Sequence, residues 1–575
     1  MPDQSPDTPD QPGEMVSPEL RARLTAWIAD DPDERDAAEL TALLNSADPA
    51  AAAELASRFS GRLEFGTAGL RGAVGAGPNR MNRAVVRAAT AALAGWLLKH
   101  DPDAARQGIV IGCDARHRSD EFAAEAARVA AGAGLRVRLL PPRQPTPLLA
   151  FAVRRLGAAA GVMITASHNP PADNGYKLYT ADGAQIVPPA DVEIEAAIAG
   201  LGPLSQVPVA PADSPLISQL GDEVAQEYLD AVCGISPAPP GAAWLRFVYT
   251  PLHGVAGDLA LRAFEKAGYA EPDVVAPQAQ PDPDFPTVAF PNPEMAGTLD
   301  LALALARRSA ADLVIANDPD GDRLAVALPD PDALGGWRML TGDQVGALLG
   351  AYLLDRTAGQ DGDLLLVSTV VSSTLLARIA AAAGARYAET LTGFKWIVRA
   401  AEAHPDARFL LGYEEALGYA VTDVVRDKDG IGAALAILGL ATMARSGGES
   451  LLEVYDALEA AHGVHLTSQL TVTTQAPSHV TARLRAAAPT FLAGQAVTSV
   501  ADLTGGTRDL PSADVLIYKL AGARVVIRPS GTEPKLKAYL EVVEPLAGGR
   551  LAQARRAAAA RMEPLRAAVA ELLAP

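Results

Sequence analysis

Residues 161–170 read GVMITASHNP, and the interpretation of the fold starts from this stretch. Its first four residues are short and apolar, as is typical of a strand buried inside a sheet. Pro170 interrupts regular structure, so Ser167 is expected on a tight loop directly after the strand, with His168 beside it. Lys177 follows ten residues later. Such a loop would expose the serine hydroxyl to a substrate, although the stretch alone also fits an ordinary turn.

Short apolar strands alternate with alanine-rich amphipathic segments along most of the chain, which indicates α/β architecture. Functional loops at the carboxyl ends of strands suit open sheets of this kind. After about residue 463 the pattern changes to shorter alternating strands and a final alanine-rich helix, which indicates a separate α+β domain. Strands are expected at residues 108–112, 135–140, 161–164, 245–250, 311–316, 364–368, 408–411 and 523–527, and helices at 122–133, 259–267 and 374–383.

A chain of 575 residues is too long for one hydrophobic core, so several domains are expected. Linkers rich in proline, glycine or aspartate are found at residues 202–215 and 329–336. We therefore predict a disordered, acidic and proline-rich tail at 1–16, α/β domains at 17–215, 216–334 and 335–463, and the α+β domain at 464–575.

The net charge of −19 argues against nucleic acids and acidic membranes as partners. We expect no apolar run of the roughly 18 residues needed to span a bilayer, and the N-terminus lacks the pattern of a signal peptide. Cys113 and Cys233 stand in separate apolar contexts and predict neither a disulfide nor a metal site. These features predict a cytoplasmic protein, monomeric or dimeric, with no nucleic-acid or membrane partner.

Residues 318–323 read DPDGDR and follow an expected strand. Asp318, Asp320 and Asp322 would form an oxygen-rich pocket, which favours Mg²⁺ or Ca²⁺. An EF-hand does not fit, because its twelfth position would be Pro329 rather than glutamate. Three carboxylates leave an octahedral Mg²⁺ undersaturated, so a phosphate oxygen is expected to complete its shell. The alternative is a plain Asp-Gly turn.

Residues 528–535 read RPSGTEPK and follow the strand expected at 523–527. Backbone N–H groups in a glycine-containing turn form a nest for anions, and the flanking arginine and lysine add positive charge. No GxxxxGK[ST] pattern occurs, so this is not a Walker loop. We predict a second phosphate-binding site formed by Arg528, Ser530, Gly531, Thr532 and Lys535.

Residues 412–418 read GYEEALG, and Glu414 and Glu415 could accept hydrogen bonds from sugar hydroxyls. A solvated acidic turn is the alternative. Nearby in sequence, Lys395 stands among apolar residues. Partial burial there would lower its pKa towards a value useful for proton transfer.

These four motifs, in their order along the chain, at 165–170, 318–323, 412–418 and 528–535, resemble those of the α-D-phosphohexomutase family across nearly the whole chain. Supporting stretches are FGTAGLRG at 65–72 and GCDARH at 112–117, while 392–397 and 425–430 resemble the phosphoglucomutase and phosphopentomutase branch. The resemblance implies three α/β/α sandwich domains with mixed sheets and a smaller α+β C-terminal domain around one central cleft.

The resemblance also implies an intramolecular phosphotransferase that interconverts glucose 1-phosphate and glucose 6-phosphate through a phosphoserine and a bisphosphosugar. Glucose 1,6-bisphosphate would be its activator, and Ser167 would join the three aspartates around Mg²⁺. Lys395 would transfer a proton. Charge on the phosphoryl group would be stabilised by Arg71, His168, Lys177 and Arg323.

The chain departs from the family pattern in the sugar-binding motif. Ala416 stands where many members carry serine, and Gly418 where some carry histidine. Both departures fit the named branch and leave phosphomannomutase or phosphopentomutase activity open as the main role. A phosphomonoesterase is a further alternative, and intact Ser167 argues against a catalytically dead sugar-phosphate sensor.

Overall fold

The structure is a computed structural model that describes residues 16–66, 68–360, 362–474, 476–530, 535–546, 548 and 550–574. The chain forms two compact units, Met1–Gln144 with Ala152–Gly221, and Pro145–Phe151 with Asp222–Pro575. The tail predicted at 1–16 lies outside the described residues except for Val16, whose side chain is buried.

The first unit contains a six-stranded mixed sheet with the strand order β1-β5-β4-β2-β3-β6. Strands β4, β2, β3 and β6 are parallel, whereas β5 is antiparallel to both β4 and β1. Strands β2 and β4 are buried along their whole length, as continuous apolar runs in helix-covered parallel sheets are. The strands are β1 Leu70–Ala73, β2 Ile109–Cys113, β3 Val137–Leu139, β4 Ala160–Ile164, β5 Asp173–Thr180 and β6 Ile217–Gln219.

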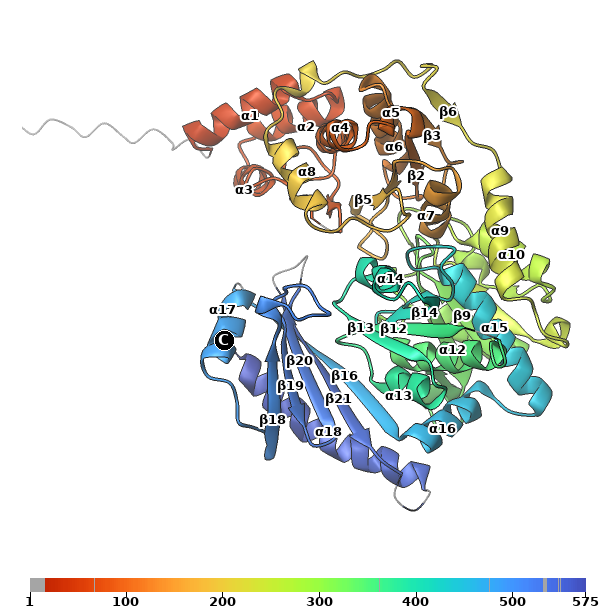
Figure 1. Ribbon diagram of the computed structural model, residues 1–575. Coiled ribbons are helices and arrows are strands. Elements are labelled where there is room, and N and C mark those ends of the chain that lie inside the picture. Colours follow the sequence, from red (N-terminus) through yellow and green to blue (C-terminus); the bar gives the residue numbers. More distant parts are fainter. Residues whose placement is uncertain are drawn as a thin grey trace, which may run out of the picture. The chain divides into compact units, whose positions relative to one another are not determined.

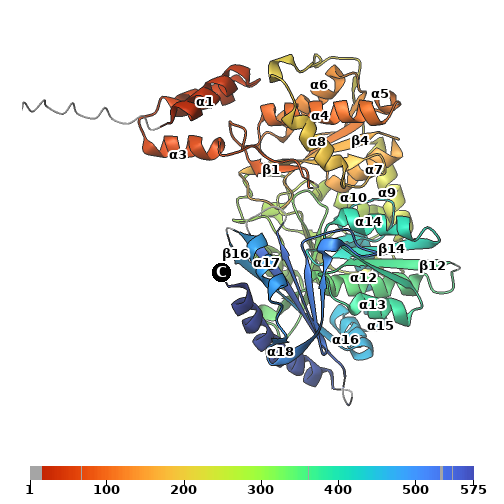
Figure 2. The ribbon, with the colours of Figure 1, turned by 60° about the vertical axis from the view of Figure 1, so that its left-hand side comes forward.

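Eight helices are described for this part of the chain, and the first three form a group of their own. Figure 2 shows α1 and α3 beside α4 and β1. Ser17, Asp33 and Asp48 cap the starts of α1, α2 and α3, which pack around a small apolar core that includes Leu24 and Leu55. The helices are α1 Pro18–Asp30, α2 Glu34–Leu44, α3 Pro49–Arg58, α4 Arg83–His100, α5 Ala104–Gln107, α6 Ser119–Gly132, α7 Thr146–Arg155 and α8 Ala190–Ala199.

The second unit begins with a five-stranded sheet of order β11-β10-β9-β7-β8. Strands β8, β7 and β9 are parallel, and β10 is antiparallel to β9 and β11. Its elements are α9 Glu223–Ile235, β7 Phe247–Thr250, α10 Gly257–Ala267, β8 Asp273–Val274, α11 Asp300–Ser309, β9 Leu313–Asn317, β10 Leu324–Pro329 and β11 Trp337–Met339.

A four-stranded sheet of order β13-β12-β14-β15 follows, parallel except for β15. Its elements are α12 Gly342–Arg356, β12 Asp363–Thr369, α13 Leu375–Ala382, β13 Arg386–Thr390, α14 Phe394–Ala403, β14 Ala407–Glu414, β15 Gly418–Ala420, α15 Gly430–Gly447 and α16 Leu451–His462.

The last sheet is antiparallel, with the order β16-β21-β20-β19-β18-β17. Helix α18 packs along β16 and β21 (Figure 1). Three α/β domains with mixed sheets followed by an α+β domain confirm the predicted fold class, whereas the exact domain borders stay predictions. The elements are β16 Val464–Thr473, α17 Pro477–Ala486, β17 Phe491–Leu492, β18 Gln495–Asp502, β19 Leu516–Leu520, β20 Ala523–Pro529, β21 Lys535–Glu544 and α18 Leu551–Leu573.

Helix α15 corrects one expectation from the sequence. Its 18 residues are long and apolar enough to cross a membrane by length and composition, contrary to our prediction that no such run exists. However, 78% of this stretch is buried inside the protein. The helix therefore has the burial of a core helix, and the apolar run reflects packing on several sides.

Candidate active site

The serine loop, residues 165–170, follows β4 as predicted. Ser167 is buried and has a φ of 53°, a left-handed backbone conformation that is uncommon for residues other than glycine. Its N–H donates to the Thr165 hydroxyl at 2.9 Å, and Asn169 donates to the Ala166 carbonyl at 3.1 Å. Such strained positions persist only where the surrounding structure fixes them.

Arg116 fixes this loop, and sequence reasoning missed its role. Its guanidinium donates to the carbonyl oxygens of Ser167, Asn169, Pro170 and Asp173 at 2.6, 2.7, 2.7 and 3.1 Å. The side chain is buried. It had appeared only as part of a supporting stretch, because a sequence gives no sign of which carbonyl groups an arginine will meet.

Asp114 completes the support of the serine loop. Its carboxylate lies 3.3 Å from Arg116 Nε and accepts a hydrogen bond from Ser119 Oγ at 2.7 Å. Burial raises the pKa of Asp114, although the Arg116 charge counteracts this effect. The ion pair therefore lies in a dry environment, where removal of one partner would be costly.

The strand order brings two predicted cations close to the serine loop. Arg71 on β1 pairs with Gly175 on β5, and Lys177 on β5 pairs with Met163 on β4. A side chain at Gly175 would lie 2.7 Å from the carbonyl oxygen of Thr165, so only glycine fits between the strands. Lys177 is buried, whereas Arg71 and His168 are half-buried.

The metal loop, residues 318–323, connects β9 to β10 in the second unit. Asp318, Asp320 and Asp322 are completely buried, and one carboxylate oxygen from each lies within 4.8 Å of the others. Burial raises the pKa of Asp318 well above its ordinary value, and the neighbouring carboxylates of Asp320 and Asp322 add to the effect. Three buried carboxylates at this spacing need positive charge, and hard oxygen ligands suit Mg²⁺. The geometry therefore allows these three residues to hold a metal ion, and their binding of Mg²⁺ stays a prediction.

Two distant segments shape the metal loop. Thr146, at the start of α7, donates from its hydroxyl to Asp320 Oδ2 at 2.7 Å and from its N–H to the Asp320 carbonyl at 2.9 Å. The turn at residues 251–254 packs against Pro319, and a side chain at Gly254 would lie 2.4 Å from the Pro319 Cα atom. Neither contact could be predicted from the loop's own sequence.

The sugar-binding motif is a hairpin rather than an irregular loop. Glu414 on β14 pairs with Gly418 on β15, and Leu417 in the turn has a φ of 62°. Hereafter residues 412–420 are called the sugar hairpin. Glu414 is buried, and burial raises the pKa of Glu415 to about 7, with the Glu414 carboxylate as the next largest cause.

Arg323 connects the metal loop to the sugar hairpin. Its backbone N–H donates to Asp318 Oδ1 at 3.0 Å, and its guanidinium donates to the Ala416 carbonyl. The same guanidinium lies 3.7 Å from Glu414 Oε1. Ala416, which stands where many family members carry serine, thus binds Arg323 through its backbone oxygen. The side chain at position 416 is not needed for this contact.

Lys428 is the second residue that sequence reasoning missed. Its ammonium lies 3.2 Å from Asp322 Oδ2 and 3.1 Å from Asp427 Oδ1, and it lies over the Phe394 ring. Burial lowers its pKa, but these two carboxylates outweigh burial and raise the pKa above its ordinary value. The only sequence signal was the VRDKDG stretch, which we had used for the family resemblance alone.

Gly418 leaves room for Lys428. A Cβ atom at this position would lie 2.4 Å from the Lys428 Cδ atom. Glycine at position 418, where some family members carry histidine, is therefore needed for the buried position of Lys428. A larger residue at 418 would displace Lys428 from Asp322.

The predicted phosphate-binding motif at residues 528–535, hereafter called the phosphate loop, runs from the end of β20 to the start of β21. Arg528 pairs with Lys537 across these strands, and the Ser530 N–H donates to the Lys535 carbonyl at 2.8 Å. The Arg528 side chain hydrogen-bonds to Tyr539. Arg528, Ser530 and Lys535 are all half-buried. The predicted contributions of Gly531 and Thr532 lie outside the described residues.

A buried polar network anchors this last sheet to the preceding domain. Glu541 on β21 accepts hydrogen bonds from Ser373 Oγ at 2.8 Å and from the Thr374 N–H at 2.7 Å. Arg524 on β20 donates to the Ser372 carbonyl, and the Ser372 hydroxyl lies 3.4 Å from Glu415 Oε2. The network therefore links the strands that carry the phosphate loop to the sugar hairpin.

Lys395 lies at the start of α14, where it is half-buried. A Cβ atom at Gly393 would lie 3.7 Å from the Lys395 Nζ atom, so the side chain folds back over the preceding turn. Its role in proton transfer stays a prediction.

Comparison with known proteins adds to this geometry. Models of the four phosphoglucomutase/phosphomannomutase domains match the chain: alpha/beta/alpha domains I, II and III at residues 62–202, 226–332 and 341–461, and the C-terminal domain at 482–558. The chain belongs to this family. The predicted resemblance to the α-D-phosphohexomutases is confirmed.

Individual relatives agree with this assignment. The chain is 42% identical to a probable phosphomannomutase of Haemophilus influenzae over 80% of this chain and 93% of that protein. It is 37% identical to a probable phosphoribomutase of Schizosaccharomyces pombe, with 91% and 94% covered. The crystal structure of a putative phosphomannomutase from Thermus thermophilus matches with a TM-score of 0.64 at 26% identity, covering 87% of this chain and 99% of that one. The family member described here is accordingly a phosphosugar mutase, an isomerase that transfers a phosphoryl group within its substrate.

Proposed function

We propose that this phosphosugar mutase interconverts glucose 1-phosphate and glucose 6-phosphate through a phosphorylated Ser167 and a bisphosphosugar. The observation that carries the proposal is the joining of the metal loop to the sugar hairpin by Arg323. It supports a substrate whose phosphoryl group and hydroxyl groups are bound side by side. Glucose 1,6-bisphosphate would act as activator, and a cytoplasmic location remains part of the proposal.

In the first half-reaction, the phosphorus–oxygen bond to Ser167 breaks while a bond to a sugar hydroxyl forms. The hydroxyl proton passes to a base, for which we propose Lys395, while the Ser167 oxygen leaves as an alkoxide stabilised by nearby positive charge. After the bisphosphosugar reorients, the Ser167 oxygen attacks the phosphorus of its other phosphate, and Lys395 returns the proton to the sugar oxygen that is released. Ordered loops suit this chemistry, because phosphoryl transfer depends mainly on positioning and on stabilisation of charge.

Asp318, Asp320 and Asp322 would hold Mg²⁺, which when bound neutralises charge on the transferring phosphoryl group. The part that we predicted for Ser167 in the metal's shell remains a prediction from the family resemblance. Arg71, His168, Lys177 and Arg323 would add positive charge or hydrogen bonds to the phosphoryl oxygens. Lys428 would hold Asp322 in place, a role that its 3.2 Å contact supports.

The far end of the substrate would be bound by the phosphate loop and the sugar hairpin. Arg528 and Lys535 would pair with the phosphate that is not being transferred, with Ser530, Gly531 and Thr532 as further donors. Glu414 and Glu415 would accept hydrogen bonds from sugar hydroxyls. A mutase must hold both ends of its substrate, and these two groups of residues supply the second end.

Phosphopentomutase activity is a second candidate for the main role. Ala416 and Gly418 replace the serine that many family members carry and the histidine that some carry, and the Schizosaccharomyces pombe relative is named a probable phosphoribomutase. A direct test compares initial rates on glucose 1-phosphate, mannose 1-phosphate and ribose 1-phosphate, with Mg²⁺ and the bisphosphate activator present. The highest kcat/KM on the glucose ester is expected, and a higher value on the ribose ester would replace the primary proposal by the second.

A further inference from the structure

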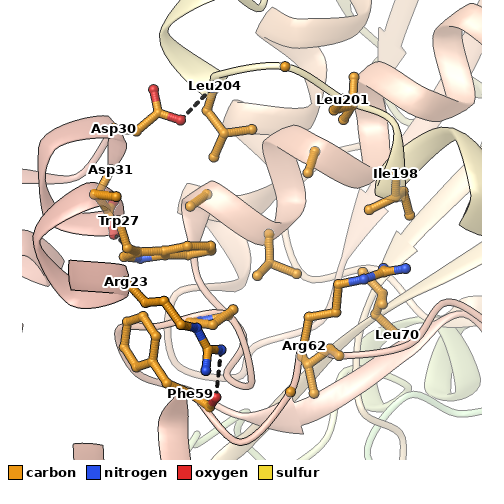
Figure 3. A pocket seen from close by; sticks show the side chains of 18 residues that line it. Arg23, Trp27, Asp30, Asp31, Phe59, Arg62, Leu70, Ile198, Leu201 and Leu204 are labelled. Atoms are coloured by element: carbon orange, nitrogen blue, oxygen red, sulfur yellow. Dashed lines mark hydrogen bonds between the residues drawn. The ribbon is translucent and has the colours of Figure 1, made fainter. Parts of the chain in front are cut away.

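A cavity of about 570 Å³ lies in the first unit, remote in sequence from the serine loop. Figure 3 shows its walls, which come from α1, the segment before β1, α4 and the chain after α8. This volume is typical of small-molecule sites. The side chains that form its apolar surface include those of Trp27, Phe59, Leu70, Ile198, Leu201 and Leu204.

The cavity does not belong to the site described above. Among the described residues that line it, none carries a predicted catalytic, metal or sugar-phosphate role. Helix α1 precedes residue 62, where the match to the family's first domain begins. One wall is therefore built from a part of this chain that the family model does not describe.

Asp31 supplies a carboxylate at one side of the cavity. Its two oxygens accept hydrogen bonds from Trp27 Nε1 at 3.0 Å and from the Asp33 N–H at 2.9 Å, and among the described residues no lysine or arginine forms an ion pair with it. Burial raises the pKa of Asp31 to about 6, and the carboxylates of Asp36 and Asp33 contribute. A nearby cation would offset this cost.

The other charged groups of the cavity already have partners. Asp30 accepts hydrogen bonds from the backbone N–H groups of Leu204 and Ser205 at 2.6 and 3.0 Å. Arg62 forms an ion pair with Glu195. The Arg23 guanidinium donates to the Phe59 carbonyl at 2.7 Å and points away from Asp31 (Figure 3).

We propose that this cavity binds an organic cation, a molecule with an apolar ring or chain and one ammonium group. The ammonium would pair with the Asp31 carboxylate beside the Trp27 ring, since indole faces attract cations. The apolar part would lie against Leu70 and Ile198. A net charge of −19 on the protein also draws cations towards it. The inference is independent of the sugar that the enzyme prefers.

Two probes of nearly equal shape test the proposal on the full-length protein by calorimetric titration. 1-Naphthylmethylamine is a cation at neutral pH, and 1-naphthalenemethanol is its neutral counterpart. The amine is expected to bind with one site per chain and at least about tenfold more tightly than the alcohol, because its contact to a carboxylate is charge-assisted. Equal affinities, or no amine binding at millimolar concentration, would overturn the proposal.

Variants locate the binding site. Asp31→Asn should weaken the amine about tenfold and leave the alcohol unchanged. Ala88→Phe fills the cavity from α4 and should remove both probes, whereas Ala91→Phe, a change at another half-buried alanine of α4 that does not line the cavity, should alter neither.

Amine binding that survives Asp31→Asn or Ala88→Phe would refute the assignment. A thermal melt accompanies each variant. Should Asp31→Asn fail to fold, Trp27→Leu serves instead and is expected to weaken the amine more than the alcohol.

Discussion

The serine loop and the metal loop both follow a buried strand, but the contacts that fix them differ. Arg116 donates to three backbone carbonyl oxygens of the serine loop and to that of Asp173 at the start of β5, so it controls the shape of the main chain. In the metal loop the aspartate side chains are held as well, by Thr146, Lys428 and Arg323, in addition to the backbone hydrogen bond from Thr146 to Asp320. A loop that carries the phosphoserine proposed above would need a fixed backbone, whereas a cation site needs fixed charges.

The largest effect is expected for Ser167→Ala, which tests the proposed phosphoserine chemistry of the serine loop. Ser167→Ala is expected to lower kcat by at least about 10⁴-fold, because loss of a nucleophile removes the covalent route. Coupled assays with glucose 1-phosphate measure the rate. Intact-mass analysis should find one phosphate on the purified wild-type protein and none on the variant; full turnover by the variant would place the chemistry elsewhere.

In the metal loop, Asp318→Asn is expected to lower the activity and to raise the thermal stability of the metal-free protein. Activity should fall about 10³-fold through loss of the metal site, yet the variant in EDTA should melt about 2–4 °C higher, because one of three mutually repelling carboxylates is gone.

The pKa of Asp318 determines how the stabilisation expected from Asp318→Asn changes with pH. A raised pKa in the folded state means that Asp318 favours folding at low pH and loses that contribution as pH rises through its folded-state pKa. The melting difference between variant and wild type should therefore grow with pH. A variant that melts lower at every pH would show that repulsion is not the dominant force in this loop.

Arg116→Lys tests the backbone-held loop. A lysine cannot contact four carbonyl oxygens at once, so we expect kcat to fall about 100-fold and the free energy of unfolding to fall by about 2–4 kcal/mol. Arg128→Lys is a matched control, because Arg128 donates to a single carbonyl, that of Ala210. If Arg116→Lys and Arg128→Lys lower the free energy of unfolding in urea and the rate by equal amounts, Arg116 has no particular role in fixing the serine loop.

Lys428→Met keeps the apolar stem of the side chain but removes its charge beside Asp322. We expect kcat to fall about 30-fold while the Mg²⁺ concentration for half-maximal rate does not rise, because a competing cation has left the cluster. A rise in that concentration would mean that Lys428 assembles the metal site rather than positioning Asp322.

Thr146→Val should have the smallest effect. It removes one hydrogen bond to Asp320, worth about 1 kcal/mol, and should raise the Mg²⁺ requirement about fivefold. Thr146→Ser retains the hydroxyl and should behave like the wild type. If Val and Ser variants are indistinguishable in Mg²⁺ titrations of rate, the hydrogen bond has no part in holding the loop.

Local patterns in the sequence predicted much of the fold. The strand expected at 161–164 corresponds to β4, and the helix expected at 259–267 to α10, because apolar periodicity is a local signal. Helices α1–α3 were not predicted, although Ser17, Asp33 and Asp48 are cap residues of the preferred types.

The sequence predicted parts of the candidate site only where the residues concerned lie close together within one motif. The three aspartates lie within five positions of each other, so their spacing alone indicated a metal site. Lys428 and Asp322 are 106 positions apart in the sequence, and Thr146 and Asp320 are 174 positions apart. Such partners depend on how sheets and helices pack, and no local pattern encodes that packing. The motifs therefore supplied the candidate reacting groups, which stay predictions, but gave no sign of the residues that hold them in place.

The dependence of the metal loop on Thr146 has a consequence for how this gene could be divided or recombined. Residues 145–151 belong to the second unit but are encoded in the middle of the first. A fragment starting at residue 222 would carry all three aspartates and lack the hydroxyl that orients one of them. The family's first domain, matched at residues 62–202, therefore contains a segment that packs with the second unit. Replacing that domain by the one of a relative would also replace Thr146, which holds Asp320 of the metal loop.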